Sequence, residues 1–305
     1  MSPDAPCVVI FTDAPGWHGR RLREAFTRLG WHSRYVSLAR CVLGTRGVQI
    51  PGLRGRLPDA AFVRGVPGGT LPQVIHRLNV LHELTARGVP VMNDGRAIER
   101  TVDKSMTTLL LERAAVPTPP TWVGEGEAAA LRFVRRELAA GHRVVMKPVF
   151  GSQGEGLQRI EALADLAPAG GSDGLYYLQR FIEPGGPVHA DLRVLVIGGR
   201  ARAAMQRRSK HWVTNRAQGG QCLPVVLDPA LATLAEAAVA AVGAAYAGVD
   251  VLEGGDGRRW VGEVNGVPAW YGLQRVTPAL DIAALLAGVL CASPTRLPQV
   301  NVRVQ

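Results

Sequence analysis

The sequence predicts a mixed fold of class α/β and α+β, with a parallel α/β domain at the N-terminus and two α+β lobes after it. Three observations support this prediction. Short apolar strands alternate with helical stretches over residues 1–94, as in parallel α/β domains. A proline-rich connector occupies residues 116–122, and two hairpin signals follow residue 186. We therefore predict an N-terminal domain over 1–94, a central lobe over 95–185 and a C-terminal lobe over 186–305.

The N-terminal domain has apolar runs short enough for buried strands, separated by stretches with helical spacing. Each helix is followed by a glycine, which commonly ends a helix. The predicted elements are a strand at Cys7–Phe11, a helix from about Arg20 to Leu29 ending at Gly30, a strand at Ala60–Val63, a helix at Leu71–Arg87 ending at Gly88, and a strand at Val89–Met92.

The central lobe begins with a largely helical stretch, in which Asp103 is placed to cap a second helical segment. Strands and helices then alternate in the order strand, helix (Ala128–Ala140), strand (Arg143–Lys147), glycine loop, strand (Gly156–Ile160), helix, strand (Leu175–Phe181). The C-terminal lobe is predicted to contain a hairpin of Asp191–Ile197 with Arg200–Arg207, an alanine-rich helix from Asp228 and Pro229 to before Gly248, and a second hairpin.

Composition excludes several classes of protein. The net charge is +10, but the basic residues are spread along the chain without a nucleic-acid-binding signature, so we expect no nucleic-acid partner. We expect no membrane helix and no signal peptide, because no apolar run is long enough and the N-terminus lacks a basic stretch before an apolar one. The four cysteines are scattered, which fits a reducing cytoplasm. The basic residues that cluster together (Arg207, Arg208, Lys210 and Arg216) favour a groove for anionic small molecules, although a solvated surface gives the same composition.

A predicted strand that ends in Lys147 is followed by a glycine-rich loop, Gly151–Gly156. The chain has only three lysines, Lys104, Lys147 and Lys210, so a retained lysine suggests a position that needs a compact ammonium. The loop lacks the spacing of a dinucleotide fingerprint and the ending of a Walker loop. A functionless glycine-rich turn would look similar, but a lysine and exposed backbone amides suit phosphates.

The second hairpin carries a candidate metal site. Asp256-Gly257 is a type I′ turn signal, and a two-residue turn there places Asp250 opposite Glu263. Asn265 points to the same face as Glu263, because it lies two residues further along the strand. Facing carboxylates repel each other, and a divalent cation would relieve that repulsion. The alternative is an ordinary solvent-exposed polar face.

These segments together resemble a known family. The matching motifs are Asn93 with Asp103-Lys104, Lys147-Pro148 with Gly151–Gly156, Gln179–Ile182, Asp191–Arg193, Ala204–Arg207, Asn215 with Gly219-Gly220, and Glu263–Asn265 with Asp281–Ala283. Their order and spacing are similar to those of ATP-grasp proteins of the RimK type, the ATP-dependent α-L-glutamate ligases. The resemblance covers nearly the whole chain and implies an ATP-grasp fold behind an N-terminal α/β domain.

The resemblance also implies roles for individual residues. The Gly151–Gly156 loop would be a mobile lid, and Lys104 and Lys147 would contact ATP phosphates under it. Backbone groups of Phe181 and Ile182 would meet the adenine edge. The remaining implied ATP-binding residues are Gly151, Ser152, Gln153, Gly154, Gly156, Gln179 and Asp191. Asp250, Glu263 and Asn265 would hold two Mg²⁺ or Mn²⁺ ions. Arg193, Arg207 and Asn215 would line the phosphate and acyl end as catalytic residues.

The activity that the resemblance implies is a cytoplasmic carboxylate–amine ligase. An acceptor carboxylate would attack ATP to give an acyl phosphate, and an amino acid, L-glutamate, would displace the phosphate to form an amide. The segment from Asn265 to Gln274 is similar to members that act on tetrahydromethanopterin-like cofactors. Two alternatives remain: a ligase that adds glutamate to the end of a protein such as a ribosomal protein, and a nucleotide-binding regulator without turnover. Family members are often multimers, so a homo-oligomer is also an alternative.

The acceptor is expected to be an anionic carboxylate compound with a flat ring. Trp270 and Tyr271 follow the predicted metal strand, and we expect them to lie near Trp212 and to stack on the acceptor. The alternative is that Trp270 packs under the C-terminal helix. One departure from the family concerns Arg180, which stands where an acidic residue is common.

Overall fold

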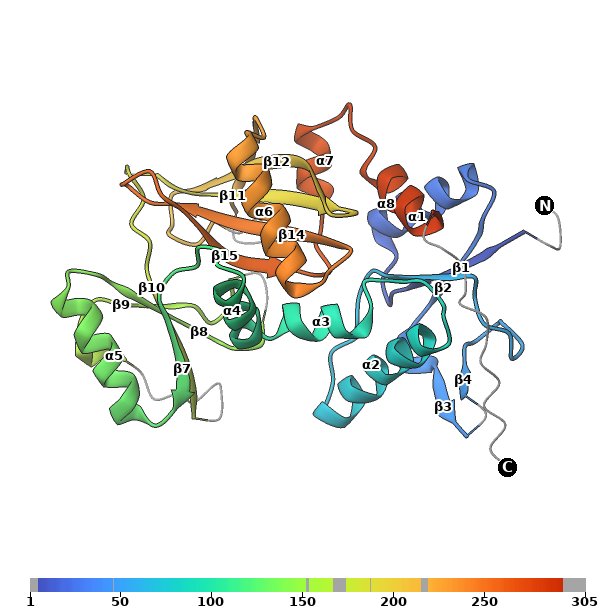
Figure 1. Cartoon of the computed structure of the whole chain (residues 1–305), viewed down its shortest axis with the longest axis horizontal. Helices are drawn as coiled ribbons and strands as arrows, with labels where there is room; N and C mark the ends of the chain where they lie inside the picture. The colour runs from blue at the N-terminus through green and yellow to red at the C-terminus, as the bar shows by residue number, and fades with distance from the viewer. Residues whose placement is uncertain are drawn as a thin grey trace. The chain divides into compact units, whose positions relative to one another are not determined.

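A computed structural model of the chain describes residues 5–45, 47–151, 154–166, 174–186, 188–214 and 219–292. These residues form two compact units (Figure 1). The first comprises residues 1–99, 244–246 and 266–305, and the second comprises 100–243 and 247–265. Among the described residues, no helix combines the length and the apolar character that crossing a membrane requires. The predicted boundary between a central and a C-terminal lobe falls inside the second unit and stays a prediction.

The first unit is built on a four-stranded parallel sheet with the strand order β2-β1-β5-β6. Its elements are β1 (Cys7–Phe11), α1 (Gly16–Arg28), β2 (His32–Val36), a 3₁₀ turn η1 (Leu38–Arg40), β3 (Val42–Gly44), β4 (Gly47–Gln49), β5 (Ala60–Val63), α2 (Leu71–Ala86), β6 (Val91–Met92), α7 (Tyr271–Val276) and α8 (Ile282–Cys291). Helix α3 (Gly95–Val102) leads into the second unit. The predicted parallel α/β class of this part of the chain is confirmed, whereas the predicted domain bounds stay a prediction.

Both faces of this sheet are covered, as parallel sheets require. Val9, Phe11 and Val63 face α2 and form one core cluster with its Leu81 and Leu84. The opposite face packs against α1 and α8. Strand alternation explains the division, because successive residues of a strand point to opposite faces.

Two predictions for this unit need correction. Helix α1 begins at Gly16 rather than near Arg20, and β6 is two residues long rather than four. Strand β2 was not predicted, because His-Ser-Arg-Tyr-Val mixes polar and apolar residues without a buried run. It is nevertheless an edge strand paired with β1 along its whole length, and an edge strand needs only one buried face.

Asn93 binds two segments that return to the first unit from later in the chain. Its side chain is fully buried. The amide nitrogen donates to the carbonyls of Tyr246 (2.7 Å) and Gly266 (2.5 Å), and the amide oxygen accepts from the backbone N–H groups of Ala245 (2.7 Å) and Tyr246 (3.1 Å). All four hydrogen-bonding positions of the amide are therefore used.

We expect Asn93→Ala to lower the free energy of unfolding by about 3 kcal/mol, because buried backbone donors and acceptors would lose their partners. Urea denaturation followed by circular dichroism measures the change. Asn79→Ala on the exposed side of α2 is the matched control and should change the stability by less than about 0.5 kcal/mol. Equal stability of the two variants would contradict this role of Asn93.

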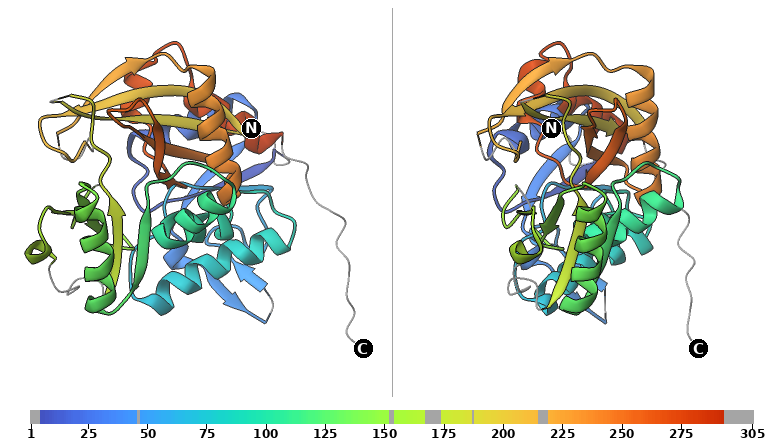
Figure 2. Two further views of the ribbon diagram at one scale, coloured as in Figure 1. Left: turned by 60° about the vertical axis from the view of Figure 1, so that its left-hand side comes forward. Right: turned by 90° about the vertical axis from the view of Figure 1, so that its left-hand side faces the viewer.

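The second unit contains two sheets (Figure 2). The first has the order β7-β10-β8-β9 and is antiparallel. Its elements are α4 (Lys104–Arg113), β7 (Thr121–Glu125), α5 (Glu127–Ala139), β8 (Val144–Lys147), β9 (Gln158–Ile160), a 3₁₀ turn η2 (Leu163–Asp165) and β10 (Leu175–Arg180). Helix α5 buries Phe133 and Val134 against Val144 and Leu178 of this sheet. Asp103 caps α4 as predicted, since its carboxylate accepts from the Met106 N–H at 3.0 Å.

The other sheet has the order β13-β12-β11-β14-β15. Its elements are β11 (His189–Ile197), β12 (Arg200–Ser209), β13 (Gln221–Val225), α6 (Pro229–Val242), β14 (Tyr246–Glu253) and β15 (Arg259–Asn265). The prediction that the alanine-rich helix continues to before Gly248 is wrong. Gly243 ends the helix in a left-handed conformation (φ 72°), and Gly248 lies inside the buried strand β14.

The β14–β15 hairpin has the predicted pairing of Asp250 with Glu263, although its turn differs from the prediction. Near the turn Glu253 pairs with Arg259, which is one residue away from the register of a two-residue turn at Asp256-Gly257. A bulge next to Asp250 restores the expected register. The extra residue is Gly262, which lies between the partners of Val251 and Asp250.

Candidate active site

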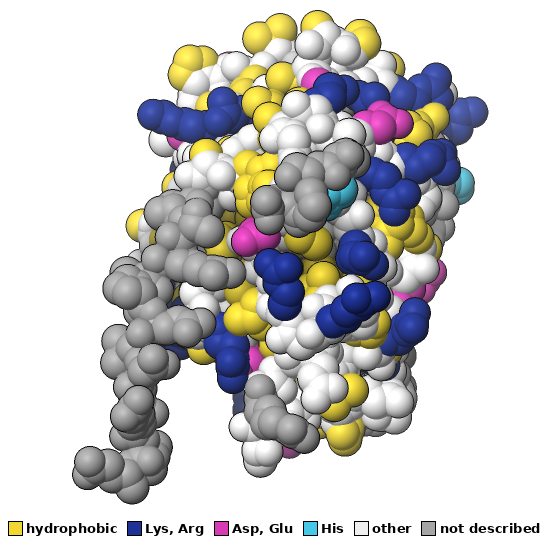
Figure 3. All heavy atoms as spheres, turned by 90° about the vertical axis from the view of Figure 1, so that its right-hand side faces the viewer, with side chains coloured by type: hydrophobic (Ala, Val, Ile, Leu, Met, Phe, Trp, Pro, Cys, Tyr) yellow, Lys and Arg dark blue, Asp and Glu magenta, His cyan; other side chains and the backbone are white. Residues whose placement is uncertain are grey.

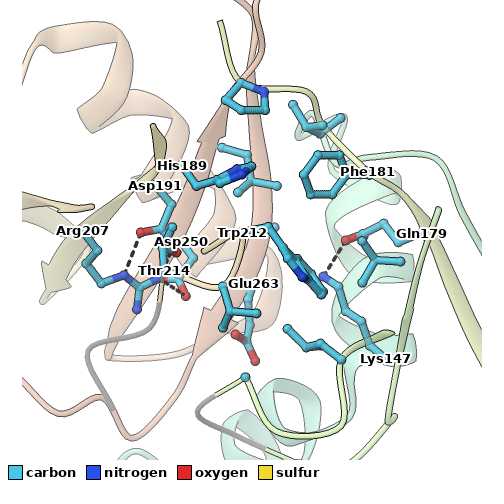
Figure 4. A pocket seen from close by; sticks show the side chains of 18 of the residues that line it. Lys147, Gln179, Phe181, His189, Asp191, Arg207, Trp212, Thr214, Asp250 and Glu263 are labelled. Atoms are coloured by element: carbon cyan, nitrogen blue, oxygen red, sulfur yellow. Dashed lines mark hydrogen bonds and ion pairs between the residues drawn. The ribbon is translucent and has the colours of Figure 1, made fainter. Parts of the chain in front are cut away.

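A pocket lies between the two sheets of the second unit (Figure 4). It brings together many of the residues that the sequence singled out: Lys104, Lys147, Gly151, Gly154, Gln179, Phe181, Ile182, Asp191, Arg207, Asp250 and Glu263. Arg193, Gly156 and Asn265 lie outside the lining. Ser152, Gln153, Asn215 and Arg216 lie outside the described residues, so their predicted roles stay predictions.

Lys147 ends strand β8 and directs its ammonium into the pocket (Figure 4). Its Nζ donates to Gln179 Oε1 at 2.6 Å. The Gln179 amide nitrogen donates in turn to Thr121 Oγ1 at 2.9 Å and to the Tyr177 hydroxyl at 3.2 Å. Burial lowers the pKa of Lys147 to about 8, and the carboxylate of Glu263 opposes that shift. The pocket therefore holds an ammonium that gains stability when an anion arrives.

Lys104 begins helix α4 and connects the glycine loop to Glu263. Its Nζ donates to the carbonyl of Gly151 at 2.8 Å and lies 4.0 Å from Glu263 Oε1. Burial lowers the pKa of Lys104, with Glu263 and Asp103 acting in the opposite direction. Lys104 and Lys147 thus share the neighbourhood of one carboxylate, and both are partly desolvated.

Two arginines neutralise Asp250. Arg193 forms a two-pronged ion pair with it, with Nη2 at 2.7 Å from Asp250 Oδ2. Arg207 Nη2 lies 2.9 Å from the same oxygen, while Arg207 also forms a two-pronged pair with Asp191, its partner across the β11–β12 hairpin. The four groups carry two positive and two negative charges, so the cluster has no net charge.

Burial acts against the charges of Asp250 and Arg207, and the opposite charges around them overcome it. Burial alone would raise the pKa of Asp250, but Arg193 and Arg207 hold it below its ordinary value. Burial alone would lower the pKa of Arg207, but Asp250 and Asp191 hold it above. The side chains are almost completely buried, so these ion pairs are fixed in position.

Arg193 and Arg207 also affect the candidate metal site. A divalent cation is not required to relieve repulsion between Asp250 and Glu263, because Asp250 is already neutralised by guanidinium groups. Glu263 is 30% exposed in its side chain and has a distant partner in Lys104. Asn265 Nδ2 donates to the Gly248 carbonyl at 3.3 Å, which leaves its amide oxygen as an acceptor. This set suits Mg²⁺, which is typically held by one or two carboxylates together with phosphate oxygens and water.

Aromatic rings line another part of the pocket. The Phe181 ring lies 6.1 Å from the Trp212 ring and 6.4 Å from the His189 ring, measured between centroids. The Phe181 N–H donates to the Arg143 carbonyl at 2.8 Å, so its own carbonyl and the backbone of Ile182 are the groups left for the edge of a base. Sequence reasoning missed His189, although it lies on the same face of β11 as Asp191, two residues further along.

The prediction that Trp270 stacks on an acceptor is wrong. Trp270 is 1% exposed in the first unit, and its ring packs against Trp17 (4.9 Å) and His18 (4.7 Å). Tyr271 also contacts Trp17, with ring centroids 5.0 Å apart. Trp270 therefore has a packing role, as the alternative held, and the rings that it contacts lie at the start of α1.

Arg180 has a specific partner that explains the departure from the family pattern. Its Nε donates to Glu137 Oε2 at 2.8 Å, and Arg136 Nη2 lies 2.9 Å from the other oxygen of the same carboxylate. Glu137 is 2% exposed, and burial would raise its pKa, but the two arginines hold the pKa below its ordinary value. Arg180 therefore fixes the end of β10 to helix α5 at the wall of the pocket.

Comparison with known proteins agrees with the fold. Residues 101–290 match the RimK-like ATP-grasp domain. The solved structure of the ATP-grasp ligase PsnB, with a phosphomimetic variant of its minimal precursor, Mg and ADP, superposes with a TM-score of 0.71 at 20% identity, covering 95% of this chain and 98% of that one. The fold is thus that of the ATP-grasp ligases, which use ATP and Mg²⁺. The chain belongs to the RimK-like ATP-grasp family and is an ATP-dependent ligase.

Two curated relatives indicate the range of the family. The chain is 35% identical over 232 residues to the tetrahydromethanopterin:alpha-L-glutamate ligase of Methanococcus maripaludis, covering 73% of this chain and 75% of that protein. It is 31% identical over 199 residues to the alpha-aminoadipate–LysW ligase LysX of Saccharolobus solfataricus, covering 62% of this chain and 70% of that protein. The predicted resemblance to RimK-type glutamate ligases is therefore confirmed.

Proposed function

We propose that this enzyme adds L-glutamate to an anionic, tetrahydromethanopterin-like small molecule by forming an amide bond. The 35% identity to a ligase named for that acceptor is the observation that carries the proposal. The pocket supports it, because two desolvated lysines and a partly exposed carboxylate surround a space that suits the phosphates of a metal-bound nucleotide.

The two lysines would bind the phosphates of ATP. Lys147 is held by Gln179, and Lys104 is held by the carbonyl of Gly151 at the start of the glycine loop. Phe181 and Ile182 would meet the adenine, and Asp191 also lines the pocket. Gly154, Gly156, Ser152 and Gln153 would cover the phosphates with backbone amides, as the sequence predicts.

Glu263, Asn265 and Asp250 would hold two Mg²⁺ ions together with phosphate oxygens. Bound there, the ions would neutralise charge on the transferred phosphoryl group and orient it. Both carboxylate oxygens of Asp250 are bonded to arginines, whereas Glu263 Oε1 lies 4.0 Å from Lys104 and the Asn265 amide bonds Gly248 through its nitrogen. We therefore assign Glu263 as the principal protein ligand and Asp250 as a ligand shared with Arg193 and Arg207.

The chemistry needs positioned charges and no protein nucleophile. The carboxylate oxygen of the acceptor attacks the γ-phosphorus of ATP, the bond to ADP breaks, and an acyl phosphate forms. The amine of glutamate then attacks the acyl carbon and phosphate leaves with the bond electrons, while the amine loses a proton. Arg193 and Arg207 would keep Asp250 in place at the acyl end, and Asn215 would contribute there as predicted.

A protein acceptor is the second candidate. It is supported by the relative whose name includes LysW as the acceptor, at 31% identity. A regulator without turnover does not fit a member of a ligase family that has both lysines and the carboxylates in one pocket. Mass spectrometry separates these alternatives when the enzyme, ATP, Mg²⁺ and isotope-labelled glutamate are incubated with a reduced pterin acid or with a peptide that ends in glutamate. Label in the pterin acid supports the proposal, whereas label in the peptide alone supports the second candidate.

Trp212→Ala should raise the KM for ATP by about tenfold, because a base stacked on an aromatic ring gains about 1–3 kcal/mol. The KM values for glutamate and for the acceptor should stay within about twofold. Initial rates with each substrate varied in turn give the three constants. A selective rise in the KM of the acceptor would instead return Trp212 to the acceptor site that the sequence predicted.

ATP binding should take up a proton above pH 8. The pKa of Lys147 in the free enzyme is about 8, and bound phosphate raises it, so a deprotonated fraction must be protonated on binding. The proton uptake should be small at pH 7 and clear at pH 9. Calorimetry of an ATP analogue in buffers of different ionisation enthalpy measures it, with Lys147→Met as the control that should take up less. Equal uptake by both proteins would assign the proton to another group.

A further inference from the structure

A hollow of about 1040 Å³ lies along the free edge of strand β2 in the first unit, and its lining includes no residue assigned to the active site. We call it the β2 hollow. Its walls are the strand itself over residues 32–36, the segment 51–57, and the side of α1 that carries Arg23 and Thr27. The hollow is therefore elongated along the strand, and five strand residues span about 16 Å.

The β2 hollow is strongly basic. Arg23, Arg34, Arg54 and Arg56 line it, and none of these arginines forms an ion pair with any described residue. Asp59 is the one acidic residue of the described lining, and its carboxylate accepts from the Cys7 N–H at 2.8 Å. Figure 3 shows a face of the chain on which Lys and Arg side chains outnumber Asp and Glu side chains.

Two hydroxyl groups in the hollow lack partners. Ser33 Oγ and Tyr35 Oη are both buried and have no hydrogen-bond partner among the described residues. Burial raises the pKa of Tyr35, so its hydroxyl stays protonated and can donate. The guanidinium of Arg23 stacks on the Tyr35 ring at 3.9 Å. Unsatisfied buried hydroxyls are uncommon in folded proteins and call for an ordered water or an ion as a partner.

The main chain of β2 also has an unused side. His32 N–H donates to Pro6 and the Val36 carbonyl accepts from Thr12, so these residues face β1. Because successive residues of a strand alternate, the N–H and C=O groups of Ser33 and Tyr35 point to the free edge. Among the described strands, β2 pairs with β1 alone. A strand edge that lacks a proline and pairs with no other strand can accept another strand.

Gly52 shapes the opposite wall. It has a left-handed backbone (φ 83°), and a Cβ there would lie 2.9 Å from Arg34 Nη1. The glycine therefore leaves the room that the Arg34 guanidinium occupies beside the strand. Leu53 and Leu57 pack on the core behind it, so the wall is fixed.

From these observations we infer that the β2 hollow binds an extended acidic peptide, which adds to the sheet as a strand beside β2. The free N–H and C=O groups of Ser33 and Tyr35 would pair with the peptide backbone, and the four arginines would bind its carboxylates. This site is separate from the ligase pocket and goes beyond the proposed function.

Other occupants fit less well. A single phosphate would use two or three arginines and leave the strand edge unpaired. An RNA strand would suit the charge but has no backbone donors and acceptors with the spacing of a β-ladder. The C-terminal segment 293–305 of this chain contains two arginines and no acidic residue, so its side-chain charge has the same sign as that of the hollow and would be repelled by it.

The test uses the full-length protein and a fluorescent peptide, Glu-Val-Glu-Val-Glu-Val-Glu, blocked at both ends. Fluorescence anisotropy at low salt should show saturable binding that weakens as the salt concentration rises. A saturating non-hydrolysable ATP analogue should not displace the peptide, which separates this site from the ligase pocket. The double variant Arg34→Ala, Arg56→Ala should bind about tenfold more weakly. Arg40→Ala, which removes an exposed charge from the same unit outside the hollow, is the matched control and should bind normally.

Backbone pairing has its own test. Two peptides are N-methylated at alternate residues, one set on each edge of the extended chain. One set should lose binding and the other should keep it, because only one edge faces β2. Equal binding of both methylated peptides would overturn strand addition. Absence of saturable binding, displacement by the ATP analogue, an unchanged affinity in the double variant, or tighter binding of an RNA oligonucleotide at the same arginines would overturn the proposal as a whole.

Discussion

Glu263→Gln should lower Mg²⁺-dependent turnover by about a thousandfold, equivalent to about 4 kcal/mol of transition-state stabilisation. The substitution keeps the shape of the side chain and removes the charge that we assign as the principal metal ligand. Lys104 would also lose its nearby carboxylate, 4.0 Å away. Steady-state rates across a range of Mg²⁺ concentrations measure the effect, and higher Mg²⁺ should restore part of the activity. Glu125→Gln at the exposed end of β7 removes the same charge from the same unit and should leave the rates unchanged.

The stability of this variant checks the surrounding electrostatics. From sequence alone, removing one of two facing carboxylates is expected to stabilise the metal-free protein. The structure predicts little change in Tm, because Arg193 and Arg207 already neutralise Asp250. A variant that keeps normal turnover with an unchanged Mg²⁺ dependence would remove Glu263 from the metal site.

The residues that pair across a hairpin were harder to predict from the sequence than the positions of the strands. Apolar runs located β11, β12, β14 and β15, but bulges decide which residues face each other. On β11–β12 the turn register would place Asp191 opposite Gln206, and a bulge moves Arg207 into that position. A bulge adds one residue without changing the apolar pattern appreciably, so periodicity does not reveal it.

The buried charge cluster was also beyond the sequence. Arg193 and Arg207 were expected to line the acyl end, and Asp250 was expected to need a cation. The guanidinium groups of one hairpin neutralise the carboxylate of another, which requires knowing that β11 and β14 are neighbours in the sheet. Lys147 could be found because its signal is local: a strand, a rare residue type and a glycine loop lie consecutively in the chain.

Lys147→Ala should weaken ATP binding and lower turnover by at least about a hundredfold, equivalent to about 2.7 kcal/mol. Burial disfavours the Lys147 ammonium when no anion is present, as its lowered pKa shows. ATP phosphates would remove that penalty, so binding energy is lost when the charge is absent. Rates and nucleotide binding measure the effect. Arg132→Ala, an exposed charge on α5 in the same unit, is the control and should behave as the parent protein.

Lys147→Arg should also fail, although it keeps the charge. The Lys147 ammonium donates to Gln179 Oε1 at 2.6 Å and lies 5.9 Å from the centre of the Tyr177 ring, inside a wall fixed by the hydrogen bonds of Gln179. A longer planar guanidinium cannot place its charge at the same point without displacing Gln179. Turnover should therefore fall by at least about tenfold while the Tm stays close to that of the parent, which separates misplaced charge from misfolding. Near-normal rates with arginine would show that the site needs a positive charge and not a lysine, and the inference from lysine scarcity would be wrong.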